Sequence, residues 1–261
     1  MKTHDTQDDV AILMPAKLSS TRLPRKHLLE IKGKPVIQHL IERVKSHTGI
    51  KKIILCITEN DAELEEIAEK SGILWHRGKA GSVLKQYADV VQKYSLRYVV
   101  NVDCDDLLVN FDLINRTASI MESLEDSVDF LTWDGYPLGC APYGMSGFGI
   151  TWLDRNTSDD VEYIWKLFQK SEDLQKVAIQ VTSKELSKPY VKDIRLTLDY
   201  IEDFRLFEII YNRLYERDHH IHYDNLMRFI DQNPHLVEVN KHMNTAYREH
   251  QHGQDNKKTK I

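Results

Sequence analysis

Short apolar runs alternate with amphipathic segments along this chain, and the alternation constrains its fold more than any other feature of the sequence. The apolar runs are centred on Val10–Met14, Lys51–Ile57 and Arg97–Val102, each short enough for one buried strand. After the first run, apolar residues recur at helical spacing from Val36 to Val44. Strands that alternate with helices are typical of βα units. The sequence therefore predicts an α/β fold of three layers, α/β/α and Rossmann-like, with a mainly parallel sheet.

The length of the chain, 261 residues, suits one large domain. We expect this domain over residues 1–248, with a substrate-binding excursion near 134–190. Residues 134–149 hold five of the 11 glycines, which predicts loops that form a pocket wall, although a structural linker is equally compatible. Residues 249–261 are polar and lack periodicity, so we expect a tail that frays.

Charge and hydropathy limit the class of protein. The formal net charge is -5, whereas a protein that binds nucleic acid normally presents a large basic surface. The chain has no apolar run near the roughly 18 to 20 residues that a membrane span needs, and residues 1–9 do not resemble a signal peptide. We therefore expect a cytoplasmic protein that binds neither nucleic acid nor membranes.

The cysteines and histidines do not form a recognisable metal motif. Cys56, Cys104 and Cys140 are far apart and lack CxxC spacing, which argues against a disulfide framework and a zinc site. Cys56 and Cys104 border apolar runs, so we expect buried thiols there. The histidines of His219–His222 cannot all face one ion on regular structure, and a metal site there is disfavoured.

A cationic loop follows the first apolar run. From Lys17 to Lys34 the chain has six basic residues and one acid, Glu30. Basic loop residues are often only solvated surface, but a cationic loop after a buried strand is where an open α/β sheet holds a phosphate-bearing ligand. Neighbouring hydroxyl groups add hydrogen-bond donors. The candidate nucleotide-binding residues in this loop are Pro15, Ala16, Lys17, Ser19, Ser20, Thr21, Arg22 and Lys26.

A second basic loop, predicted over Trp75–Ser82, contains two glycines that would let the backbone approach a ligand closely. We expect Arg77, Gly78 and Ser82 to line the same pocket, although Ser82 also suits a helix N-cap and such loops are often only connections. The spacing fits neither a Walker loop nor a dinucleotide fingerprint, so those nucleotide-binding classes are disfavoured.

Acidic residues follow the third apolar run. Asp103, Asp105 and Asp106 would be costly to crowd together unless water or a cation neutralised them. Carboxylate oxygens at this position suit Mg²⁺ or Mn²⁺. We assign Asp103 to the nucleotide site and Asp105 to the metal, whereas Asp106 suits a cap for the helix that begins near Phe111.

Residues 193–198 alternate in polarity and predict a further strand that ends at Asp199. Three motifs lie at these predicted strand ends. Residues 16–26 read A-K-L-S-S-T-R-L-P-R-K, residues 101–108 read N-V-D-C-D-D-L-L, and residues 193–203 read D-I-R-L-T-L-D-Y-I-E-D. They resemble the motifs A-R-x-x-S-T-R-L-P-G-K, N-V-x-G-D-E-P-L and D-x-R-x-T-x-D-x-x-E-D of the cytidylyltransferase family that activates 3-deoxy-manno-octulosonate and related acidic sugars. The pattern is most similar to the branch associated with spore-coat polysaccharide biosynthesis.

The resemblance implies a CTP-dependent nucleotidyltransferase with a nucleotide-diphospho-sugar transferase-like fold, Mg²⁺ or Mn²⁺ as cofactor, and a homodimer. At the matching positions, Lys26 and Arg22 would hold the triphosphate, and Lys17 would stand where the family usually has arginine. These three are the candidate catalytic residues. Asp105 and Asp199 would hold the metal, although Asp199 also suits a plain helix N-cap.

Two residues depart from the family motif. Lys17 offers a point charge where arginine offers a planar fork, so bidentate phosphate contact is lost there. Arg25 replaces the loop glycine, which either restricts the turn or adds a phosphate contact. The residues that bind the acceptor in the family do not align through Asp134–Gly149, which leaves the acceptor open.

The reaction implied by the resemblance is attack of an acceptor oxygen on the α-phosphorus of CTP, which gives a CMP-linked product and pyrophosphate for surface polysaccharide biosynthesis. The acceptor is an acidic sugar, or else a phosphonate or polyol phosphate. The main alternative is a metal-dependent glycosyltransferase in which Asp103-Cys104-Asp105 is a D-x-D element and a sugar nucleotide is consumed. A non-catalytic nucleotide-binding scaffold is a third hypothesis.

Overall fold

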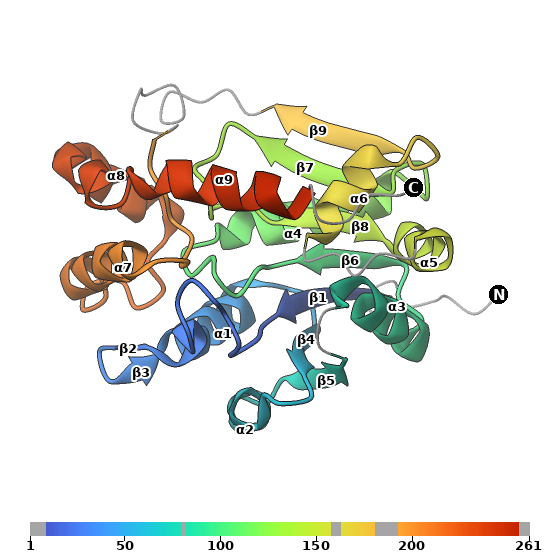
Figure 1. The fold of residues 1–261 in the computed structure, drawn as a ribbon, viewed down its shortest axis with the longest axis horizontal. Helices are drawn as coiled ribbons and strands as arrows, with labels where there is room; N and C mark the ends of the chain where they lie inside the picture. The colour runs from blue at the N-terminus through green and yellow to red at the C-terminus, as the bar shows by residue number, and fades with distance from the viewer. Residues whose placement is uncertain (1–8, 80–81, 158–162, 181–192, 256–261) are drawn as a thin grey trace.

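A seven-stranded sheet forms the centre of the protein in the computed structural model, which describes residues 9–79, 82–157, 163–180 and 193–255. The strand order is β5-β4-β1-β6-β8-β7-β9 (Figure 1). All neighbouring strands are parallel except that β8 is antiparallel to both β6 and β7. The strands are β1 (Val10–Pro15), β4 (Lys52–Thr58), β5 (Leu74–Gly78), β6 (Tyr98–Asn101), β7 (Phe130–Asp134), β8 (Tyr143–Ser146) and β9 (Lys176–Gln180). A separate antiparallel pair joins β2 (Glu30–Ile31) and β3 (Lys34–Pro35).

Helices cover both faces of the sheet. One hydrophobic cluster packs α1, α2 and α4 on one face, and a second packs α3, α5 and α6 on the other. A third cluster joins α7, α8 and η4 to the β2–β3 pair. The helices are α1 (Val36–His47), α2 (Ala62–Lys70), α3 (Val83–Tyr94), α4 (Phe111–Ser123), α5 (Gly147–Asn156), α6 (Ile164–Lys170), α7 (Ile201–Leu214), α8 (Tyr223–Gln232) and α9 (Met243–Asp255), with the 3-10 turns η2 (Lys26–Leu28) and η4 (Pro234–Val239). The three-layer α/β fold predicted from the sequence is confirmed.

Strand β1 lies in the middle of the parallel half of the sheet, between β4 and β6. Side chains alternate across a strand, so Ile12 and Met14 pack into the cluster on one face while Ala11 and Leu13 pack into the cluster on the other. Burial on both faces explains why this stretch of sequence is continuously apolar. The cationic loop therefore begins at the carboxyl end of a strand that is enclosed on both faces.

Two local predictions differ from the structure. The expected loop over Trp75–Ser82 is in its first part strand β5, which pairs in parallel with β4. The expected strand at 193–198 is extended but has only an isolated bridge between Arg195 and Leu138. Its alternation is real, because Ile194, Leu196 and Leu198 are buried in the third cluster, but the partner is a helical layer rather than a sheet.

The expected loop region and the expected tail also contain regular structure. The glycine-rich segment 134–149 includes β8 and the first turn of α5. Helix α9 continues to Asp255, past the expected boundary at residue 248 (Figure 1). The proposed excursion near 134–190 falls partly outside the described residues. Within the described ranges, no helix is long and apolar enough to cross a membrane, and Cys56, Cys104 and Cys140 are buried free thiols.

Gly147, at the start of α5, provides a test of how closely this layer packs. A Cβ atom there would lie 2.2 Å from the carbonyl oxygen of Leu96. Because a backbone oxygen cannot move aside cheaply, Gly147→Ala is expected to lower the free energy of unfolding by about 1–3 kcal/mol in urea denaturation. Gly49→Ala is the control, because nothing lies within 4 Å of its added Cβ. Equal stability of the two variants would contradict the packing described here.

Candidate active site

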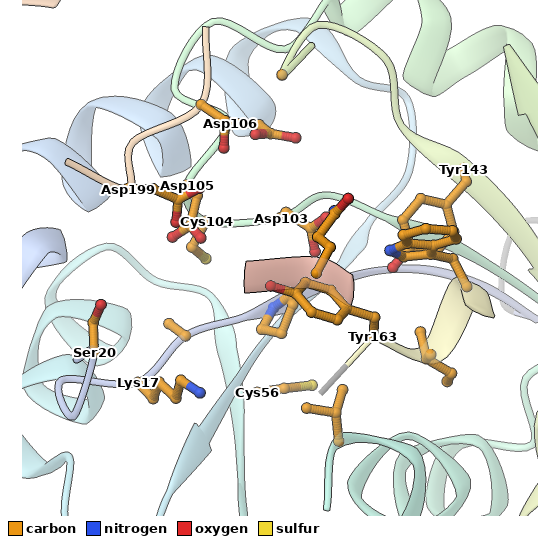
Figure 2. Close-up of a pocket in the computed structure, with 18 of the residues that line it drawn as sticks. Lys17, Ser20, Cys56, Asp103, Cys104, Asp105, Asp106, Tyr143, Tyr163 and Asp199 are labelled. Atoms are coloured by element: carbon orange, nitrogen blue, oxygen red, sulfur yellow. The ribbon is translucent and has the colours of Figure 1, made fainter. Parts of the chain in front are cut away.

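A cleft of about 700 Å³ opens at the carboxyl ends of the central strands. Residues that follow β1 and β6 line it, together with the end of β4, the start of α3, the segment before α7, and helix α9. Figure 2 shows acidic side chains from two distant segments, Asp105 and Asp199, lying side by side in it. An open α/β sheet binds ligands at this edge, so the cleft is the candidate active site.

Most of the predicted site residues line this cleft. They are Pro15, Ala16, Lys17, Ser19, Ser20, Thr21, Arg22, Lys26, Ser82, Asp103, Asp105 and Asp199. Arg77 and Gly78 do not line it, so the expectation that they share the pocket is wrong. They belong to β5, from which Arg77 reaches Glu65 and covers the ring of Trp75.

Lys26 joins the two predicted metal ligands. Its Nζ lies 2.6 Å from Oδ2 of Asp105 and 3.0 Å from Oδ1 of Asp199, and the lysine is 4% exposed. Burial alone would lower the pKa of Lys26, but the two carboxylates raise that pKa above its ordinary value, so the ammonium stays charged. The structure thus brings one positive charge between two carboxylates from strand ends far apart in the sequence.

Asp199 is held by three cations. Besides Lys26, Nη2 of Arg22 lies 2.5 Å from Oδ1, and Nη2 of Arg195 lies 2.7 Å from Oδ2. Burial alone would raise the pKa of Asp199, but the three cations outweigh burial and hold that pKa below its ordinary value. The N-cap of α7 is Tyr200, so the alternative role of Asp199 as a plain cap is wrong.

A buried scaffold supports Asp199 from behind. Arg195 is fully buried, and its Nε donates to Oδ1 of Asp203 at 2.9 Å. Asn240 donates to the same oxygen at 2.8 Å and to the carbonyl of Arg195 at 2.9 Å. Oδ2 of Asp203 accepts hydrogen bonds from the backbone N–H groups of Asp199 and Tyr200, and Tyr200 is the N-cap of α7. Hydrogen bonds therefore fix both the backbone and the side chain of Asp199.

Among the residues that the structure describes, Asp103 and Asp106 form no ion pair. Oδ1 of Asp103 accepts from Asn101 at 2.8 Å, and Asn101 in turn accepts from the hydroxyl of Tyr87. Burial and the nearby charge of Asp105 raise the pKa of Asp103 to about 6. Burial and Asp103 also raise the pKa of Asp106. Asp106 does not cap α4, since Asn110 is the N-cap and accepts from the N–H of Asp112.

The loop after β1 has an unusual backbone at Arg25. This residue has a φ of 56°, in the left-handed region that glycine favours, and its N–H donates to the carbonyl of Leu18. The side chain points to α2, where Nη2 lies 2.8 Å from both carboxylate oxygens of Glu63. Arg25 does not line the cleft. It therefore takes the conformation of the glycine it replaces and turns its charge away from the candidate phosphate site.

Several cleft residues were not singled out from the sequence. His27 is 2% exposed and its Nε2 lies 3.5 Å from Oδ1 of Asp105, while burial lowers its pKa to about 4. Tyr247 on α9 places its ring 4.4 Å from the guanidinium of Arg195. His27 follows the loop motif directly and Arg195 lies inside the third motif, so both could have been found. Tyr247 carries no sequence signal, because only the packing of α9 brings it to the cleft.

Among the residues that the structure describes, no group of three or more histidine, cysteine or acidic side chains is arranged to hold a metal ion by itself. The histidines near residue 220 pack on each other and on aromatic rings; His47 contacts both His220 and His222. The disfavoured metal interpretation of that cluster therefore gains no support.

Comparison with known proteins gives a family match for the part of the chain that contains the cationic loop and the acidic motif after β6. Residues 11–135 match the sequence profile of a family described as cytidylyltransferase. These residues belong to the cytidylyltransferase family. The match confirms the resemblance for the first two motifs and, with it, the enzyme class, a nucleotidyltransferase. The third motif, at residues 193–203, lies outside the matched residues. The glycosyltransferase alternative is disfavoured by the same match. The spore-coat branch stays a prediction.

Some relatives match less than half of the chain at higher identity, and another matches nearly all of it at lower identity. A 3-deoxy-manno-octulosonate cytidylyltransferase of Actinobacillus pleuropneumoniae is 35% identical over 117 residues, 43% of this chain and 45% of that protein. One from Francisella tularensis is 33% identical over 125 residues, 46% of this chain and 49% of that protein. The chain thus spans less than half the length of these two enzymes. An uncharacterized protein of Methanocaldococcus jannaschii is 24% identical over 244 residues, 91% of this chain and 97% of that protein.

Solved structures share the fold. A cytidylyltransferase from Leptospira borgpetersenii has a TM-score of 0.79 at 22% identity and covers 88% of this chain and 96% of its own. CMP:2-keto-3-deoxy-manno-octonic acid synthetase, solved with CTP, has a TM-score of 0.56 at 13% identity, with 78% and 98% covered. A Mycobacterium tuberculosis protein solved with manganese has a TM-score of 0.52 at 14% identity, with 75% and 95% covered. At these low identities, the TM-scores show a common fold and nothing more.

Removing Arg195 tests the buried charge scaffold. Arg195→Met leaves the carboxylates of Asp199 and Asp203 without their buried partner, and we expect a loss of about 3–5 kcal/mol in the free energy of unfolding, measured with urea. Arg97→Met is the matched control, since Arg97 pairs with Asp126 while 44% exposed and is expected to cost at most about 1 kcal/mol. A loss for Arg195→Met no larger than for Arg97→Met would contradict the role assigned to this arginine.

Proposed function

We propose that the protein is a metal-dependent cytidylyltransferase that couples CTP to an acidic sugar or a related acceptor. An acceptor oxygen attacks the α-phosphorus, the bond from that phosphorus to the pyrophosphate oxygen breaks, and pyrophosphate leaves with the electron pair. The observation that carries the proposal is the Lys26 ammonium bridging Asp105 and Asp199 beside the loop of the family motif.

The cations of the cleft suit a triphosphate. Lys17, Arg22 and Lys26 line it together. A charge pair about 4 Å apart is worth roughly 1 kcal/mol in water but about 4 kcal/mol at an effective dielectric of about 20. Several cations that converge in a partly dry cleft therefore attract a triphosphate strongly. Arg22 and Lys26 are already oriented by Asp199, which reduces the reorganisation needed when phosphate charge arrives. These residues would bind and align the triphosphate for in-line attack.

The carboxylate pair fits a divalent cation. Asp105 and Asp199 present oxygens around a single positive centre, the ammonium of Lys26, and hard oxygen ligands suit Mg²⁺ or Mn²⁺. Both residues would contribute ligands, with phosphate oxygens and water completing the coordination, because Mg²⁺ is usually held by one or two carboxylates plus substrate phosphates. A bound divalent ion would supply neutralisation of the charge that develops on the phosphate oxygens.

The acceptor would lie at the β7–β8 end of the cleft. Trp133, Tyr143 and Tyr163 line this part, and Thr132 adds a hydroxyl. The names of the octulosonate cytidylyltransferase relatives support an acidic sugar and a role in surface polysaccharide biosynthesis. A phosphonate or polyol phosphate is the alternative acceptor. The same resemblance supports a homodimer, and the use of CTP supports a cytoplasmic location.

Substitutions at the bridging residues test the proposal directly. Lys26→Ala and Asp105→Asn are each expected to lower pyrophosphate release from CTP by at least about 100-fold with 3-deoxy-manno-octulosonate as acceptor, since each removes a preorganised charge from the transition state. Lys34→Ala is the control, because Lys34 bonds Glu42 and Tyr215 outside the cleft. Full activity of either cleft variant would contradict the assigned site.

Nucleotide binding can be measured without knowing the acceptor. With Mg²⁺ present, CTP at 100 times its dissociation constant is expected to stabilise the fold by about 2.7 kcal/mol and to raise the melting temperature, whereas UTP, ATP and GTP should raise it less. A chelator should remove most of the CTP effect, because the metal joins the triphosphate to the carboxylates. Equal shifts for all four nucleotides, or a shift that survives the chelator unchanged, would contradict this assignment.

A further inference from the structure

Gln86 on α3 presents a side-chain amide to the cleft in a single orientation. The residue is 5% exposed and lines the cleft. Its Nε2 donates to the carbonyl of Ile57 at 2.5 Å and to the carbonyl of His76 at 3.2 Å. These carbonyls belong to β4 and β5, so both N–H groups of the amide are used by the ends of two strands.

The remaining atom of the amide, Oε1, is therefore a fixed acceptor. A flipped amide would direct Oε1 at two carbonyl oxygens, which offer no proton, so the orientation is set by the backbone. No residue in the described ranges donates a hydrogen bond to Oε1. An acceptor on a residue that lines the cleft, with no donor among the described residues, is suited to a ligand donor.

The sheet order positions this acceptor relative to the phosphate site. Along the edge β5-β4-β1-β6, Gln86 lies at β5 and β4, the cationic loop follows β1, and Asp103 follows β6. Thr58 and Ser82 line the cleft on the same side as Gln86. A nucleotide whose phosphates lie on the cationic loop and the acidic motif therefore directs its base toward β4 and β5.

We propose that Oε1 of Gln86 accepts a hydrogen bond from the exocyclic amino group of cytosine and so selects CTP over UTP; this inference rests on the proposed function. Cytosine presents an N4 donor where uracil presents the O4 acceptor. Uracil would place two acceptor oxygens against each other and leave both unpaired in a partly dry site, which a site built around a hydrogen bond rejects strongly.

Gly78 supports the same assignment, although it does not line the cleft. A Cβ atom at this position would lie 2.8 Å from Cγ and 3.0 Å from Cδ of Gln86. Because Gly78 has no side chain, it leaves room beside β5 for the side chain of Gln86. Gly78→Ala is therefore expected to displace the amide of Gln86, although the substituted residue does not itself line the cleft.

Equilibrium binding of CTP and UTP, each with Mg²⁺, tests the proposal by calorimetry. The wild-type protein is expected to bind CTP at least about tenfold more tightly than UTP, which corresponds to about 1.4 kcal/mol. Gln86→Met keeps the length of the side chain but removes the acceptor, and should reduce the ratio to about threefold or less. Gly78→Ala should reduce it as well. Gln38→Met is the matched control and should leave the ratio unchanged, since Gln38 bonds Glu42 away from the cleft.

The outcomes separate this inference from the proposed function. Variants that keep the full preference for CTP would overturn the role of Gln86 and leave the cytidylyltransferase proposal standing. A wild-type protein that binds CTP and UTP equally would overturn both. Binding of neither nucleotide would overturn both. Thermal unfolding shows whether each variant is folded. If Gln86→Met is unfolded, the ratio of CTP to UTP affinity is measured for Gly78→Ala instead, and it tests the role of Gln86 in the same way.

Discussion

The charge on which the site depends is the buried carboxylate of Asp199. A carboxylate that is 2% exposed is costly to hold in a protein unless cations pair with it. Arg22 and Lys26, which lie 177 and 173 positions away in the chain, and the fully buried Arg195 supply that pairing. The same contacts join the loop after β1 to the segment before α7. Neutralising one buried charge therefore brings together the two halves of the cleft.

Charge is distributed unequally along the cleft, and this has a chemical consequence. Asp199 is saturated with cations and its pKa is lowered, whereas burial and neighbouring carboxylates raise the pKa of Asp103 and Asp106. Of the carboxylates that follow β6, Asp105 pairs with Lys26, whereas Asp103 and Asp106 form no ion pair among the described residues. A triphosphate that entered with a divalent ion, as proposed, would supply both signs of charge, phosphate for the cationic loop and metal for the acidic motif.

Much of the site could be predicted because the relevant signals are local. Polar residues that follow a buried strand lie at the carboxyl edge of a parallel sheet, so the loop residues from Pro15 to Lys26 and the acidic motif were located from sequence order alone. The errors arose where a local pattern had two solutions. The stretch at Arg77 and Gly78 has loop-like composition but pairs with β4, and the alternation at 193–198 packs against helices rather than joining the sheet.

The sequence by itself determined the alternation of strands and helices, the position of the cationic loop and the family motifs, because each depends on residues that are neighbours along the chain. Only the tertiary structure decided which charges pair, that Arg25 turns toward α2, that α9 brings Tyr247 to the cleft, and that the carbonyls of Ile57 and His76 fix the amide of Gln86. Each of these depends on contacts between segments distant in sequence. Burial then makes one arrangement favourable, since an unpaired charge or amide inside the protein is costly.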